Sequence, residues 1–324
     1  MVSRRGCLLV AVLAVAALLA MWSFFGGWYG SGPLEKDSNF VVPNGASLTA
    51  VAERLEDKGV IRSAGGFTPR ARIFGGGGGI KAGEFRIPAH ASPSRVFSII
   101  CSDDVIRRFV TIPEGMPSIM VQERLMATPE LTGEVAVPEE GSVLPDSYAF
   151  QRGQTRESVL LRMQAAMRRT LEELWAKRGP DLAVESPEEA VILASVVEKE
   201  TGKPEERRMV AGLYSNRLKQ GMLLQADPTI IYPITRGKPL GRRIRQSEIQ
   251  AVNDYNTYTM VGLPKHPITN PGKASIEAVL HPAKTEALYM VADGTGGHAF
   301  ARTLEEHNAN VAKWFAIRRE RGEL

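Results

Sequence analysis

One segment, Ser186–Thr201 (SPEEAVILASVVEKET), constrains the fold most, because its first residues encode a helix start and those that follow are almost all apolar. Ser186 suits the N-cap, Pro187 suits the first helical position, and Glu189 completes a capping-box pattern. Apolar residues then occupy nearly every position from 190 to 197. This pattern predicts a largely buried helix, and we expect the rest of the chain to be organised around it.

Two carboxylates, Glu198 and Glu200, lie at the end of this predicted helix. Because a helix turns by about 100° per residue, Glu200 shares a face with Leu193 and Val197, whereas Glu198 points roughly the opposite way. Desolvation on an apolar face favours a protonated carboxyl, which can donate a proton near neutral pH. The alternative is a helix end whose acids are solvated or paired with a neighbouring lysine such as Lys199. Helix geometry alone leaves both interpretations open.

An uncharged run of 22 residues, Cys7–Trp28, follows Arg4 and Arg5 and is long enough to cross a bilayer of about 30 Å as a helix. The positive-inside rule then predicts a single-pass protein of the plasma (inner) membrane with a cytoplasmic N-terminus. The remainder is expected outside, in the periplasm if the envelope has an outer membrane. A cleaved signal peptide is the competing interpretation, with residues 14–16 (AVA) as a cleavage pattern. We favour an anchor because apolar residues continue to Trp28.

The remaining 300 or so residues resemble an α+β protein in which short strands alternate with helices. We predict a cytoplasmic tip and transmembrane anchor in residues 1–30, a small α+β module in 31–106, and a larger mixed α/β domain in 107–324. Predicted short strands include 39–42, 60–61, 83–87, 107–112 and the buried 287–292; predicted helices include 47–58, 118–131, 157–178, 205–219 and 303–318.

Composition excludes several classes of function. The formal net charge of +4 is mild and spread out, so no nucleic-acid partner is expected. Cys7 begins the predicted membrane segment, whereas Cys101 lies far along the part expected outside the membrane. No disulfide between these two cysteines is therefore predicted. The five-glycine run at 75–79 lacks the Gly-Lys-Ser/Thr ending of a phosphate-binding loop, and no G-x-S-x-G or H-E-x-x-H pattern occurs. We therefore expect no cofactor and no metal.

Polar side chains in two later motifs are the candidate companions of Glu200: Gln225, Asp227, Tyr255, Asn256 and Tyr258. Aromatic faces and amides suit sugar rings and acetamido groups, so the tyrosines around Asn256 are candidate substrate-binding residues. Asp227 is a candidate second carboxyl, since glycoside cleavage commonly uses two. The alternative for the tyrosine motif is a well-packed turn.

The ordered motifs ASVVEKET, NRL, GM-LQADPT, YNTY, GLP, HPA and VADGTGGH-F resemble those of the MltG/YceG family of endolytic murein transglycosylases. The resemblance covers nearly all of the chain beyond the apolar run. It implies one N-terminal membrane helix, a LysM-like module and a catalytic α/β domain. It also implies that the catalytic residue is the second glutamate of the EKE motif, Glu200.

The reaction implied by the resemblance is non-hydrolytic cleavage of the β-1,4 bond between N-acetylmuramic acid and N-acetylglucosamine within a glycan strand. Glu200 would serve as the single general acid and base, and the product would end in a 1,6-anhydro ring. The expected partners are peptidoglycan strands, the membrane and peptidoglycan synthases, with a role in limiting nascent strand length. Two alternatives remain: a muramidase that adds water, and a non-catalytic peptidoglycan-binding or scaffolding protein in which Glu200 is structural.

Overall fold

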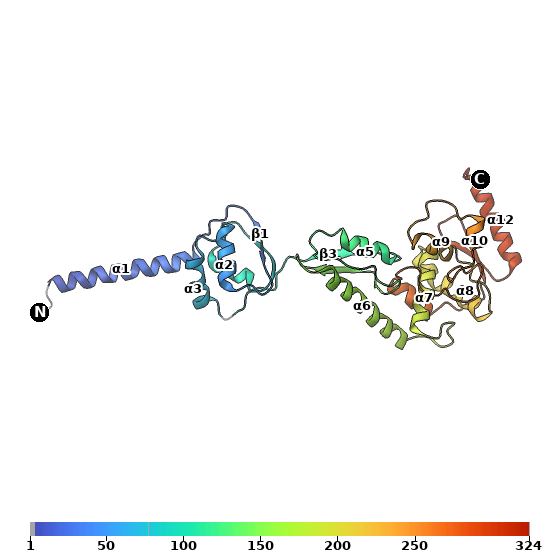
Figure 1. Ribbon diagram of the computed structural model, residues 1–324, viewed down its shortest axis with the longest axis horizontal. Coiled ribbons are helices and arrows are strands. Elements are labelled where there is room, and N and C mark those ends of the chain that lie inside the picture. Colours follow the sequence, from blue (N-terminus) through green and yellow to red (C-terminus); the bar gives the residue numbers. More distant parts are fainter. Residues whose placement is uncertain (1–3, 77, 324) are drawn as a thin grey trace. The chain divides into compact units, whose positions relative to one another are not determined.

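The chain forms two compact units, which we describe separately from a computed structural model covering residues 4–76 and 78–323. The first unit comprises residues 1–108 and 150–152, and the second comprises 109–149 and 153–324. The extreme N-terminal residues of the predicted cytoplasmic tip, Leu324 and one glycine of the five-glycine run lie outside the described residues. The predicted mixture of helices and strands behind an apolar N-terminal helix is confirmed (Figure 1).

The first unit is a small α+β structure around one strand pair. Its elements are α1 (Arg4–Tyr29), β1 (Ser38–Val42), α2 (Leu48–Asp57), α3 (Ala64–Phe74), β2 (Gly83–Ile87) and α4 (Pro93–Ile100). Strands β1 and β2 pair antiparallel, with Ser38 opposite Ile87 and Val42 opposite Gly83. The inward side chains of both strands meet the apolar faces of α2, α3 and α4 in one core.

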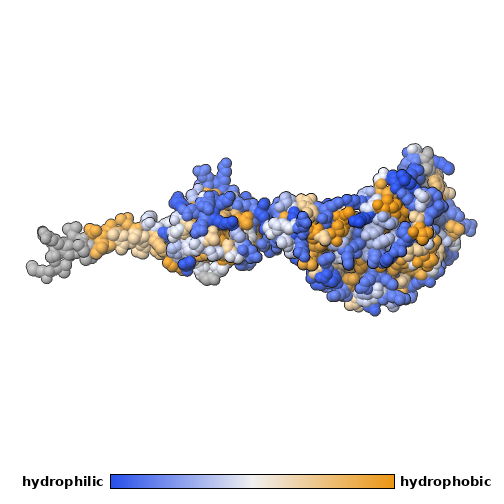
Figure 2. All heavy atoms as spheres, in the orientation of Figure 1, coloured by the Kyte–Doolittle hydropathy of each residue, from blue (hydrophilic) through white to orange (hydrophobic). Residues whose placement is uncertain are grey.

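Helix α1 joins an exposed apolar stretch to this core. Residues Ala11–Tyr29 are long and apolar enough to cross a membrane, by length and composition, and a signal sequence near an N-terminus passes the same test. Figure 2 shows the apolar surface along α1, where Trp22 is 80% exposed. Trp28, by contrast, is buried and its ring lies 5.6 Å from that of Phe67. The last turn of α1 is therefore part of the small unit's core.

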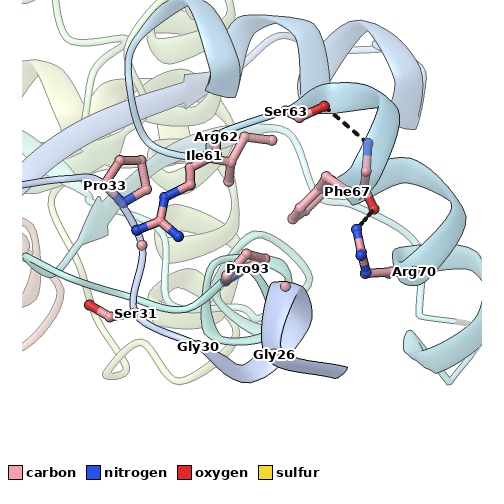
Figure 3. A pocket seen from close by; sticks show the side chains of 13 residues that line it. Gly26, Gly30, Ser31, Pro33, Ile61, Arg62, Ser63, Phe67, Arg70 and Pro93 are labelled. Carbon is pink, nitrogen blue, oxygen red and sulfur yellow. Dashed lines mark hydrogen bonds between the residues drawn. The ribbon is translucent and has the colours of Figure 1, made fainter. Parts of the chain in front are cut away.

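Arg70 holds the end of α1 against α3 (Figure 3). Its guanidinium donates hydrogen bonds to the carbonyl oxygens of Phe24, at 2.9 Å, and Gly66, at 2.7 Å. It also lies 4.8 Å from the centroid of the Phe24 ring. A Cβ atom at Gly27 would come within 2.9 Å of this guanidinium, so a side chain there would displace the contact. Because Phe24 lies in α1 and Gly66 in α3, the Arg70 guanidinium links the two helices.

The second unit is mainly helical. Its elements are β3 (Arg108–Thr111), α5 (Ser118–Met126), β4 (Ser147–Phe150), α6 (Arg156–Ala176), α7 (Pro187–Glu200), the 3₁₀ turn η1 (Pro204–Glu206), α8 (Arg207–Lys219), α9 (Asp227–Thr235), α10 (Gln246–Ile249), α11 (Lys273–Leu280), β5 (Tyr289–Ala292), β6 (His298–Ala301) and α12 (Leu304–Glu320). Strand β3 pairs with β4, β5 pairs antiparallel with β6, and the boundary between the units falls within β3 and β4.

Helix α7 lies in the core of the second unit. Every residue from Leu193 to Val197 is buried, and α7 packs against α6, α8, α9 and α11. Ser186 caps its start by accepting a hydrogen bond from the Glu189 backbone N–H at 3.1 Å. The carboxylate of Glu189 accepts from the N–H of Glu185 at 2.7 Å, one residue before the N-cap that a capping box would use. The predicted buried helix is confirmed.

Three details differ from the sequence predictions. The pair Val60–Ile61 was predicted as a strand, which is wrong: it forms a turn whose side chains fill the core of the small unit. Helix α3 was not predicted, because Gly65, Gly66 and Pro69 lower its helix propensity. The strand at the end of the chain, β5, is half-buried rather than buried.

Candidate active site

The end of α7 opens into a cleft of about 540 Å³, which we call the Glu200 cleft. Its walls come from α7, α8, α9, the turn before α11, the β5–β6 hairpin and the start of α12. The side chains used below are Glu200, Tyr214, Arg217, Gln225, Asp227 and Tyr258. The other five of these side chains lie up to 58 positions from Glu200 in the sequence, and they line the same cleft as its carboxyl group.

Glu200 is the last residue of α7, and its carboxyl lies in an apolar environment. Its Oε1 atom is buried and has no hydrogen-bond partner among the described residues, although part of the residue reaches the cleft. Burial, reinforced by the negative charge of Asp227, raises the pKa of Glu200 to about 8, against the opposing effects of Tyr214 and Arg217. The carboxyl is therefore protonated at neutral pH and available as a proton donor.

Glu198 has a different environment, although its side chain is only 6% exposed. Its Oε2 accepts a hydrogen bond from the N–H of Gly272 at 3.0 Å, and its Oε1 lies 3.9 Å from the Arg207 guanidinium. Exposure therefore does not distinguish the two glutamates, although they point to different sides of the helix. Pairing distinguishes them: Glu198 is held as a structural acceptor, whereas Glu200 has an unpaired oxygen.

Two sequence motifs meet beside Glu200 because threonine hydroxyls join them. The N–H of Ala226 donates to Thr257 Oγ1 at 3.0 Å, and the hydroxyls of Thr229 and Thr257 lie 2.9 Å apart. The N–H of Gln225 donates to the Thr257 carbonyl at 3.1 Å, and Gln225 has a φ of 54°. This left-handed conformation is costly for a residue with a side chain, so the surrounding bonds maintain a strained turn at the cleft.

Asp227 and Tyr258 form a polar pair in the cleft. The Tyr258 hydroxyl donates a hydrogen bond to Asp227 Oδ1 at 2.6 Å. Burial raises the pKa of Tyr258, and the hydrogen bond to Asp227 adds to that effect. A neutral phenol is a fixed donor, so it orients the Asp227 carboxylate.

Asn256 and Tyr255 lie outside the Glu200 cleft. The amide of Asn256 is fully buried and donates to the carbonyl oxygens of Glu248, Ile249 and Ala251, at 3.3, 2.9 and 2.7 Å. Its Oδ1 accepts from the Tyr258 N–H at 3.0 Å, so Asn256 organises the turn that presents Tyr258. Its side chain has no surface to offer a sugar, in agreement with the packed-turn alternative.

Tyr255 lines a separate cleft of about 720 Å³, together with Tyr232, Glu140 and His266. The rings of Tyr232 and Tyr255 lie 5.0 Å apart. Glu140 accepts a hydrogen bond from the N–H of Ser118 at 2.8 Å, and burial raises its pKa to about 7. The structure thus brings together Glu200, Gln225, Asp227 and Tyr258, and places Tyr255 elsewhere.

Two residues at the cleft were missed by the sequence predictions. Tyr214 is 2% exposed, and its interaction with the Glu200 carboxyl lowers the pKa of that group, against the effect of burial. Arg217 donates to the carbonyl oxygens of Leu223 and Leu224 and to Gln225 Oε1, at 3.0, 2.9 and 3.3 Å. Their spacing of three on α8 places both on one helix face, and Arg217 belongs to the NRL motif. That spacing was the available signal.

The chemistry available in the cleft is proton transfer by a carboxylic acid. Within residues 4–76 and 78–323, no group of three or more histidine, cysteine, aspartate or glutamate side chains is placed to hold a metal ion. The Glu200 acid can protonate a leaving group, and the Asp227 side chain beside it can stabilise positive charge that develops nearby.

Comparisons with known proteins identify relatives of the chain. The YceG-like family matches residues 40–313. The endolytic murein transglycosylase of Bacillus subtilis is 26% identical over 325 aligned positions, covering 89% of both chains. The protein of that name from Streptococcus pneumoniae is 36% identical over 181 positions, covering 54% of this chain and 32% of the relative.

A solved structure extends the similarity to the fold. The crystal structure of a YceG-like protein from Listeria monocytogenes matches with a TM-score of 0.52 and 25% identity, covering 85% of this chain and 98% of that one. The family match spans well over half of the chain and includes both units. The resemblance found in the sequence motifs is thus confirmed, and the chain belongs to the YceG-like family.

Proposed function

We propose that this protein is a membrane-anchored endolytic transglycosylase that cleaves peptidoglycan strands. The observation that carries the proposal is the buried, unpaired Oε1 of Glu200 beside Asp227, in a cleft where the pKa of Glu200 rises to about 8. The relatives from Bacillus subtilis and Streptococcus pneumoniae are named endolytic murein transglycosylases, which supports the same class of lytic enzyme. A proton donor at neutral pH is what cleavage of a glycosidic bond needs first.

In the proposed reaction, Glu200 donates its proton to the oxygen that bridges N-acetylmuramic acid and N-acetylglucosamine. The bond from muramyl C1 to that oxygen breaks with oxocarbenium-like character, and its electron pair stays on the leaving oxygen. The Glu200 carboxylate then takes the proton of the muramyl C6 hydroxyl as O6 bonds to C1. The acid is regenerated, no water is consumed, and the new end is a 1,6-anhydro ring.

The polar side chains of the cleft have proposed roles in substrate binding. Asp227, oriented by Tyr258, lies where a negative charge stabilises the developing oxocarbenium ion. The exposed amide of Gln225 is a candidate partner for an acetamido group. Tyr255 is proposed to contact a more distant part of the strand, in the separate cleft that it lines with Tyr232.

The apolar helix α1 suggests where the protein is located in the cell. The apolar stretch of α1 anchors the protein in the plasma (inner) membrane, with Arg4 and Arg5 on the cytoplasmic side and both units outside. The small unit is proposed to act as a LysM-like glycan-binding module. A membrane-anchored cleaving enzyme meets strands as they are made, so we propose that it limits nascent strand length beside peptidoglycan synthases.

The test is mass spectrometry of peptidoglycan strands digested with the wild type and with Glu200→Gln. Anhydromuramyl ends from the wild type and a rate loss of about 10²–10⁴-fold in the variant are expected. A muramidase is the second candidate, because Asp227 supplies a second carboxyl in the same cleft and could activate water. Reducing muramyl ends would identify the muramidase. No cleavage by either protein would favour a non-catalytic binding role, and equal cleavage by both would show that Glu200 is only structural.

A further inference from the structure

A second cleft continues from the Glu200 cleft. It has a volume of about 440 Å³, and its other walls are Pro113, Met116, Pro117, Met120, Pro239 and Leu240, so we call it the Pro/Met cleft. Lys199, Pro228 and Ile231 line both clefts. Shared wall residues make the two clefts one groove, with Glu200 on one side of Lys199 and the apolar walls on the other.

Lys199 is the uncompensated charge of this groove. Glu114 is paired with Arg207 at 3.0 Å, and Lys238 is paired with Glu123 at 2.5 Å. For Lys199, no carboxylate lies within 4 Å in the described parts of the chain, and its ammonium makes no hydrogen bond there.

Acidic groups farther from Lys199 do not neutralise it. Its next-door acids are Glu198, which is bonded to Gly272, and Glu200, which is protonated at neutral pH. Among the interactions that shift the pKa of the Glu140 carboxyl, the charge of Lys199 has the smallest effect. The ammonium group is exposed, so it is free to bind an anion that enters the groove.

We propose that Lys199 binds a carboxylate of the peptide stem on the muramyl residue being cleaved, with the stem lying in the Pro/Met cleft. This inference rests on the proposed function. Cleavage within a strand requires a groove that is open at both ends. Each intact muramyl residue carries a peptide stem, and the methyl groups of its alanine residues suit the apolar walls of the Pro/Met cleft. On such a residue the lactyl carboxyl is an amide, so the remaining carboxylates belong to the peptide. A strand stripped of peptides offers the lactyl carboxylate instead, which is the other source of the same anion.

The experiment compares full-length wild type with Lys199→Met, which keeps the aliphatic length and removes the charge. Each is assayed on uncrosslinked strands that carry stems and on the same strands after an amidase has removed them. The readout is the ratio of kcat/KM on the two substrates. The exposed site favours the weak end of the range for a charge-assisted bond, so Lys199→Met is expected to lower this ratio roughly tenfold, mainly through KM; this corresponds to about 1.4 kcal/mol. Lys219→Met is the matched control, because its ammonium is paired with Asp181 at 2.8 Å and the residue lines neither cleft, and it should change the ratio by less than about twofold.

Binding is measured separately in a Glu200→Gln background, by fluorescence anisotropy of labelled strands, so that the result does not depend on turnover. Weaker binding of stem-bearing strands on adding Lys199→Met supports the proposal. An unchanged ratio, an equal loss on both substrates or a loss confined to stripped strands would each overturn it; the last would point to the lactyl carboxylate. If wild type cleaves neither substrate, the proposed function fails instead, and the anisotropy still decides the role of Lys199.

Discussion

Replacing Glu200 with glutamine should stabilise the second unit at alkaline pH. A carboxyl whose pKa is raised by folding contributes its full stability below its unfolded pKa and loses it as pH rises through the folded pKa. For Glu200 the window runs from about 4.5, its ordinary value, to about 8. Above that window the wild type must hold a buried carboxylate, whereas glutamine keeps the shape and never ionises. The gain is therefore expected at pH 8 and not at pH 4.

The magnitude follows from the size of this window. At about 1.4 kcal/mol per pH unit, the interval from 4.5 to about 8 corresponds to an upper limit of about 5 kcal/mol in the free energy of unfolding. The effect of Arg217 is already included in the pKa of about 8, but water that enters the open cleft stabilises the ionised form further. We therefore expect Glu200→Gln to be more stable than the wild type by about 2–3 kcal/mol at pH 8.

Hydrogen exchange measured by mass spectrometry is a suitable assay, because peptides from α7 and α8 report on this unit alone. Variant and wild type are compared at the same pH, so the intrinsic exchange rates cancel. Glu198→Gln is the matched control two residues away: it loses its charge interaction with Arg207 and should be destabilised by about 1 kcal/mol at pH 8. A Glu200→Gln variant that is less protected at pH 8, or equally more protected at pH 4 and pH 8, would refute the reasoning.

The remaining predictions concern activity, folding and topology. The rate kcat/KM should fall as pH rises through about 8, and Asp227→Asn should move this alkaline limb to lower pH, because the Asp227 charge helps to raise the pKa of Glu200; an unmoved limb would leave burial as the whole cause. Asn256→Ala should destabilise the second unit by about 2–3 kcal/mol in denaturant unfolding, since the turn loses a buried amide and the carbonyl oxygens of Ile249 and Ala251 lose its N–H donors. A reporter fused after Leu324 should be active only outside the cytoplasm; activity inside would contradict the proposed anchor.

The sequence predicted the parts of the site that depend on local periodicity. The burial of Glu200 follows from its position after Leu193 and Val197 on one helix face, and α7 has the predicted bounds within a residue. The turn at Asn256 illustrates the limit, because an amide that binds sugars and an amide that ties a turn have the same residue type. Only the burial of the Asn256 amide and its three carbonyl partners distinguish them.

Contacts between distant segments could not be predicted in the same way. Tyr214 and Arg217 reach Glu200 because α8 packs against α7, which depends on the whole core. The strand prediction for Val60–Ile61 was wrong because two apolar, β-branched residues in a row fit a buried turn as well as a strand. The near burial of Glu198 was missed because its partner Gly272 lies 74 residues away.

The most direct test of the central claim is the end group that wild type leaves on stem-bearing peptidoglycan strands, read by mass spectrometry beside a Glu200→Gln digest. Proton donation by Glu200 followed by ring closure predicts 1,6-anhydromuramyl ends, lighter by one water than reducing ends, which disappear in the variant. Reducing muramyl ends from the wild type, or anhydro ends that persist in Glu200→Gln, would contradict the account.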